Sequence, residues 1–146
     1  MKRYWVGGLA GLLLAVILVG CGTQGATGQV ESLSPEEIKD KIQNSEEAYI
    51  LVTDTSEEEE REEYINLVED NIEEIDVQEI NAQNPKILDG EIKLSEIGLE
   101  GSELFQSLSY YEDGKLQERI SLREQKYETL KDRKQAIHQF IDETSF

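Results

Sequence analysis

The sequence predicts an α/β domain that begins near residue 34 and follows an apolar leader and a short polar linker. Two observations support this fold class. Amphipathic segments with a 3.6-residue period alternate with short apolar runs typical of buried strands, as in helices packed on a sheet. Toward the end of the chain, two alternating segments flank a tight turn, which indicates a β-hairpin.

The first half of the domain predicts the order helix, strand, helix, strand. Ser34 and Glu37 form a capping box that opens a helix ending near residue 45. Residues 48–53 are a continuous apolar run, which favours a strand buried on both faces of a parallel sheet. The next helix carries its apolar face at Ile65, Val68, Ile72 and Ile75. Residues 76–81 predict a second strand.

The second half predicts a hairpin and a final helix. Residues 86–101 fit either a hairpin turned at Asp89-Gly90 or a short irregular helix, and we favour the helix. Residues 104–111 and 116–122 alternate around the turn Glu112-Asp113-Gly114-Lys115, which is the clearest hairpin of the chain. Residues 129–143 predict an amphipathic helix whose inward residues are Leu130, Ile137, Phe140 and Ile141.

The chain is strongly acidic, with a formal net charge of −18. Residues 31–113 hold 26 acidic and 5 basic residues, whereas residues 115–146 hold 6 acidic and 7 basic ones. So acidic a surface argues against nucleic acid, whose phosphates it would repel. The uneven charge predicts either a plain soluble surface, which we favour, or a dipolar domain whose basic C-terminal side faces an anionic bilayer.

The N-terminus holds the chain's only cysteine. A basic start at Lys2-Arg3 precedes an apolar stretch over residues 6–19, which is shorter than a comfortable membrane span. The stretch ends in Leu18-Val19-Gly20-Cys21, and the whole segment resembles a bacterial lipoprotein signal peptide with its lipobox. The alternative is an uncleaved anchor with a buried cysteine.

The lipoprotein resemblance implies that residues 1–20 are removed and that Cys21 carries the lipid. Its sulfur would receive a diacylglyceryl group, and fatty acyl chains such as palmitate would hold the protein at the extracytoplasmic face of the cell membrane. Residues 21–33 are small and polar and predict a flexible tether. Residues 34–146 then form the single folded domain of a cell-envelope lipoprotein.

The predicted element order also resembles the thioredoxin fold, a β-α-β half joined to a β-β-α half. The resemblance covers residues 34–143 and includes the Asp113-Gly114-Lys115 turn. It implies a three-layer α/β/α domain. Residues 53–58 stand where that family carries Cys-x-x-Cys, and they hold no cysteine; residues 101–103 stand where it has a cis-proline, and they hold no proline. Since a thiolate is the nucleophile of disulfide exchange, we expect no such activity.

No catalytic, cofactor-binding or metal-ligating set stands out, and we assign no cofactor. The Glu57–Glu63 run predicts a solvated helix start more than a metal site, because successive helical side chains diverge. The only histidine, His138, has no second histidine or free cysteine with which to form a zinc site or triad. Ser102 does not lie in a G-x-S-x-G elbow, and Gly20–Gly25 matches a G-x-G-x-x-G pattern only across the expected cleavage site.

These observations predict a non-enzymatic binding or accessory module anchored at the cell envelope. Its partner would be an envelope protein that contacts a sheet edge or the acidic surface after Val52. Two alternatives remain. One is an acidic envelope lipoprotein that binds divalent cations, and the other is an enzyme with an unrecognised carboxylate site.

Overall fold

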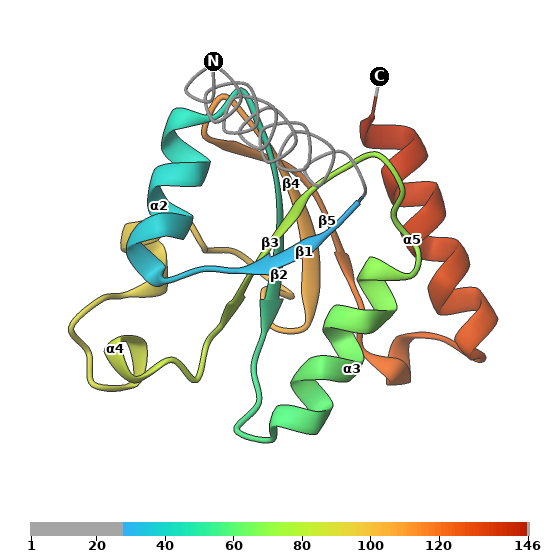
Figure 1. Ribbon diagram of the computed structural model, residues 1–146, viewed down its shortest axis with the longest axis horizontal. Coiled ribbons are helices and arrows are strands. Elements are labelled where there is room, and N and C mark those ends of the chain that lie inside the picture. The colour runs from blue at the N-terminus through green and yellow to red at the C-terminus, as the bar shows by residue number, and fades with distance from the viewer. Residues whose placement is uncertain (1–27, 146) are drawn as a thin grey trace, which may run out of the picture.

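A computed structural model describes residues 28–145, which form a five-stranded mixed sheet covered by helices on both faces (Figure 1). The strand order is β1-β3-β2-β4-β5. The first three strands are parallel, and the last two form an antiparallel hairpin. The strands are β1 (Val30–Ser32), β2 (Glu47–Thr53), β3 (Val77–Asn81), β4 (Ser107–Glu112) and β5 (Lys115–Ser121). The predicted α/β class is therefore confirmed.

Figure 1 shows α2 (Pro35–Asn44) on one side of the sheet and α3 (Glu58–Glu69) and α5 (Leu130–Thr144) on the other. One buried cluster joins the sheet to α3 and α5 around Leu51, Val68 and Phe140. A second cluster joins the other face to α2 and the 3-10 helix η1 (Leu94–Ile97). The remaining short elements are α4 (Pro85–Leu88) and η2 (Glu124–Lys126).

Local signals in the sequence explain the main elements. The Ser34 hydroxyl accepts from the Glu37 amide at 3.2 Å, and the Glu37 carboxylate accepts from the Ser34 amide at 3.0 Å, so the predicted capping box is confirmed. Ile38 and Ile42 are buried under α2, and each contributes about 1.5–3 kcal/mol of hydrophobic free energy. All residues of β2 from Ala48 to Thr53 are buried, as the continuous apolar run predicts.

Residues 86–101 include most of α4 and all of η1, so the helical alternative is confirmed over the hairpin. Residues 30–32, which we expected in the tether, instead form the edge strand β1, so the folded unit begins before residue 34. Its strand character comes from β3, whose Val77 amide donates to the Gln29 carbonyl at 2.8 Å. Three residues at an edge are too short to show a pattern of their own.

Two side-chain expectations in the second half were wrong. Leu130 was expected to point inward, but it is 52% exposed because it stands in the first turn of α5, beyond the sheet. The alternation of residues 104–111 predicts that only one of Tyr110 and Tyr111 is buried, yet both are. They lie on opposite faces of β4, and helices cover both faces.

Cys21 and the expected signal peptide lie outside the described residues. Within residues 28–145, no helix is long and apolar enough to cross a membrane.

Candidate functional site

The strongest candidate site lies where β2 and β3 end and β4 begins. Because β2 and β3 are parallel, their carboxyl ends meet at one edge of the sheet, with Thr53 opposite Asn81. The antiparallel β4 starts there too, with Ser107 opposite Val52. We call residues 53–57, 81–83 and 103–106 the carboxyl-edge loops.

Three amide side chains hold the first loop, two through its main chain and one through the Asp54 side chain. Asn81 donates to the Thr55 carbonyl at 2.8 Å and accepts from the Thr55 amide at 3.3 Å. Gln83 donates to the Asp54 carboxylate at 2.6 Å. Gln106 donates to the Asp54 carbonyl at 3.0 Å. The loop after β2 is therefore held in place from both neighbouring strands.

The start of α3 continues this arrangement. The Thr55 hydroxyl accepts from the Glu57 amide at 3.0 Å and donates to the Glu60 carboxylate at 2.8 Å. Glu57 occupies the N-cap position but makes no side-chain cap, and Glu58, Glu59 and Glu60 form the first turn. These glutamates are exposed, and negative charge is favourable at a helix N-terminus, so the run behaves as the solvated helix start that we favoured.

The loop before β4 holds two residues in the left-handed region of backbone space. Glu103 has φ of 57° and Gln106 has φ of 50°. Such residues cost on the order of 1–3 kcal/mol each unless their surroundings hold them in place. Gln106 is held at both ends, because its side chain bonds Asp54 and its carbonyl accepts from the Leu122 amide at 2.7 Å. Residues 28–145 contain no cis peptide bond.

A buried ion pair between α3 and β3 lies next to the carboxyl-edge loops. The Arg61 guanidinium of α3 donates to both oxygens of Glu79 on β3, at 2.9 and 2.8 Å. The Thr53 hydroxyl donates to the same carboxylate at 2.6 Å, and Arg61 reaches the Ser32 hydroxyl at 3.1 Å. The Glu79 side chain is fully buried. The cluster therefore ties the beginning of α3 to three parallel strands.

Electrostatics keep this pair charged. Burial by itself would raise the pKa of the Glu79 carboxyl, but hydrogen bonds from Arg61 and Thr53 outweigh burial and lower that pKa below its usual value. Hydrogen bonding to Glu79 correspondingly raises the pKa of Arg61, against the opposing effect of its own burial. Because the pair is charged and fully hydrogen-bonded, it holds α3 against β3.

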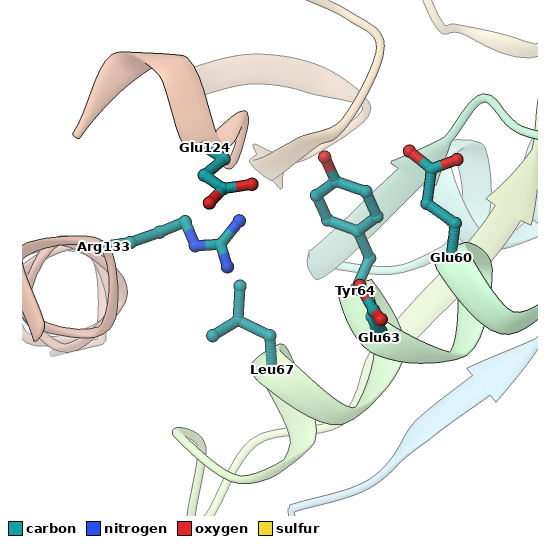
Figure 2. Close-up of a pocket in the computed structure, with 6 residues that line it drawn as sticks. All are labelled: Glu60, Glu63, Tyr64, Leu67, Glu124 and Arg133. Atoms are coloured by element: carbon teal, nitrogen blue, oxygen red, sulfur yellow. The ribbon is translucent and has the colours of Figure 1, made fainter. Parts of the chain in front are cut away.

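A second feature is a small pocket between α3 and α5. Figure 2 shows Arg133 of α5 pointing between Glu124 and Leu67, with Tyr64, Glu60 and Glu63 along α3. The pocket has a volume of about 90 Å³. One Arg133 nitrogen donates to the Leu122 carbonyl at 3.2 Å, whereas its buried Nε has no partner among the described residues. A pocket of this size is large enough for a few water molecules or one very small polar molecule.

The other residues that the sequence singled out have local roles. His138 shares a hydrogen bond of 2.9 Å with the Asn71 side chain, across α5 and the loop after α3. Ser102 accepts from Arg119 through its carbonyl at 3.2 Å. Within residues 28–145, no group of three or more His, Cys, Asp or Glu side chains could hold a metal ion.

Sequence reasoning found the loop after Val52 but missed the side chains that hold it. Asn81, Gln83 and Gln106 carry no motif, and Gln106 lies 52 positions from its partner Asp54. The only signal was indirect, namely that a redox motif would stand at residues 53–58. A scan of protein-family models and a search of curated proteins both find no match to this chain.

Proposed function

We propose that this chain is a lipid-anchored protein of the bacterial cell envelope. Its thioredoxin-like, thiol-free domain binds a partner protein through the carboxyl-edge loops. The lipid would sit on Cys21, at the extracytoplasmic face of the membrane. The observation that carries this proposal is that Asn81 of β3 and Gln106 of the loop before β4 bond the main chain of residues 54–55. Gln83 also bonds the Asp54 side chain.

Sheet topology supports the thioredoxin-like assignment. The order β1-β3-β2-β4-β5 combines a parallel β-α-β unit with an antiparallel hairpin and a final helix, which are the two halves of that fold. In a thioredoxin-like domain the loop from β2 to α3 would stand where the family carries its redox motif. It reads Thr53-Asp54-Thr55-Ser56-Glu57, so the chemistry available there is hydrogen bonding and charge.

The physical character of the loops favours binding. A loop already fixed in one conformation loses little entropy when a partner binds, so more of the contact energy remains as affinity. Strained backbone such as that of Gln106 concentrates at functional sites, where surrounding contacts maintain it. Loops placed on a rigid sheet are also where binding residues gather.

The test is photo-crosslinking in intact bacteria. A photoreactive amino acid replaces the exposed Ser56 in one full-length variant and the exposed Asp76, in the loop before β3, in another. We expect a discrete light-dependent adduct from position 56 and none from position 76. Adding Gln83→Ala to the first variant should weaken the adduct, because Asp54 then loses its amide partner.

Two controls separate the parts of the proposal. Cys21→Ser should move the protein from the membrane fraction to the medium or leave an unprocessed precursor, whereas processed, membrane-bound protein would contradict the lipid anchor. An insulin-reduction assay should match buffer, and turnover above buffer would contradict the thiol-free binding role. Equal adducts at positions 56 and 76 would contradict the carboxyl-edge loops as the contact surface.

A further inference from the structure

The described chain begins at the end of the molecule opposite the carboxyl-edge loops. Gly28 packs so closely against the loop between α3 and β3 that a Cβ there would lie 2.4 Å from the Glu73 carbonyl oxygen. Figure 1 shows β1 starting beside this loop and beside the C-terminal end of α5, while the loop from β2 to α3 lies at the far end. We call the end that holds Gly28, residues 69–76 and the end of α5 the amino pole.

The distance from the anchor to the amino pole is short. Six residues separate Cys21 from Gly28. However they are arranged, seven Cα steps of 3.3–3.6 Å span at most about 25 Å. The seven residues of β2 alone cover about 23 Å between the two ends of the sheet, before the loops at either end are added. The linker is therefore too short to pass around the domain and bring the carboxyl-edge loops to the bilayer.

The charge of the amino pole adds a second constraint. Its exposed acidic residues, with those of the neighbouring hairpin turn, are Glu69, Asp70, Glu73, Glu74, Asp76, Glu112, Asp113, Asp142 and Glu143. Lys115 is the exposed base at the same turn. An anionic bilayer repels such a surface within about one Debye length, roughly 8 Å at physiological salt. The short linker thus keeps the amino pole near the membrane, while charge repulsion keeps it from binding to the lipid surface.

We propose that the amino pole faces the bilayer and that the carboxyl-edge loops point away from it. The partner is then a protein of the extracytoplasmic space that approaches from the membrane-distal side, and not a segment embedded in the lipid. This orientation rests on the proposed lipid anchor at Cys21. It also directs Arg123, Lys126 and Lys131 away from the membrane, because they lie around η2 and the start of α5, and so it argues against a basic side that faces the bilayer.

Energy transfer to the membrane surface tests the orientation. Since Cys21 is the only cysteine and carries the lipid, one introduced cysteine gives a single labelling site in the lipidated full-length protein. Glu74→Cys labels the amino pole, and Glu57→Cys labels the loop before α3; both replace an exposed glutamate. The donor-labelled protein is placed in phosphatidylglycerol–phosphatidylethanolamine vesicles that contain an acceptor-labelled lipid.

We expect the label at position 57 to lie farther from the acceptor plane than the label at position 74, by up to about 18 Å, which is the length of the 12-residue α3 between the two sites. Ser102→Cys, on the loop before β4, should behave like position 57. Equal transfer from positions 57 and 74, or stronger transfer from 57, would overturn the orientation while the protein still floats with the vesicles. If the protein does not float with the vesicles, the proposed lipid anchor and the proposed orientation are both contradicted.

Discussion

The two faces of the sheet bury neighbouring polar residues of β3 in different ways. Alternation along β3 places Glu79 on the face of α3 and Gln78 on the face of α2. Both side chains are buried. Glu79 receives hydrogen bonds from Arg61 and Thr53, whereas the buried Gln78 Oε1 has no partner among the described residues.

This difference shows which interactions each face of the sheet depends on. A buried carboxylate without its partner costs about 3–5 kcal/mol, so Glu79 is tolerable only where Arg61 reaches it. A buried amide oxygen without a partner costs less, about 1–3 kcal/mol, and one such group can persist in a stable domain. The α3 face therefore depends on a specific contact next to the carboxyl-edge loops, while the α2 face is held by apolar packing.

The largest expected effect is the loss of the buried pair. The protein measured starts at Gly22 and therefore lacks Cys21. In it, Arg61→Met should lower the free energy of unfolding by about 3–5 kcal/mol, because Glu79 is left buried and unpaired. Urea denaturation at pH 7 measures the change. The matched control is Lys86→Met, which removes an exposed pair with Glu36 and should leave stability nearly unchanged. Equal losses would show that the buried pair contributes no more than a surface pair.

A pH series examines the same contact without removing Arg61. The folded-state pKa of Glu79 is lowered, so the stability from this carboxylate is fully present above the usual glutamate pKa of 4.5 and declines as pH falls through the folded-state value. The stability advantage of the wild type over Glu79→Gln should therefore be constant above pH 4.5 and shrink below it. Urea denaturation of both proteins at each pH is the measurement. An advantage that grows as pH falls would contradict a lowered pKa.

The two faces also differ in how much the sequence could predict. The α2 face depends on a helix with a local start signal, the capping box at Ser34, and this helix was predicted. The α3 face depends on the pairing of Arg61 with Glu79, 18 positions apart, and no local pattern records that pairing. The apolar residues of β3 are only Val77 and Ile80, and nothing in its sequence indicates that Gln78 and Glu79 are buried.

The candidate site could be predicted only in part, for the same reason. The position of the loop after β2 follows from strand order, which the apolar runs reveal. Its conformation depends on Gln83 and Gln106, which contact Asp54 across 29 and 52 positions of the sequence. The left-handed backbone of Gln106 had no signal at all, because that region usually calls for glycine or asparagine.

On the α2 face, removing the unpaired acceptor should help. Gln78→Met keeps a similar volume and replaces a buried amide with an apolar group, so we expect a gain of about 1 kcal/mol in urea denaturation. Gln125→Met, at an exposed position, should change little. A loss of stability at position 78 would mean that its amide makes a contact with a bound water that the methionine cannot replace.

The smallest expected effect is a change of melting temperature with salt, which distinguishes the contribution of surface charge from that of the buried pair. Repulsion among the exposed acids destabilises the folded chain, and 0.15 M NaCl screens it over about 8 Å, so the melting temperature should rise from its low-salt value. A buried pair is screened much less, so the double variant Arg61→Met/Glu79→Leu should show the same rise as the wild type. If the rise disappears in the double variant, salt acts on the pair and the comparison between the faces fails. MgCl₂ at equal ionic strength should add little, whereas a large extra rise with Mg²⁺ or Ca²⁺ would favour the cation-binding alternative, in which acidic side chains converge on an ion and do not merely repel one another.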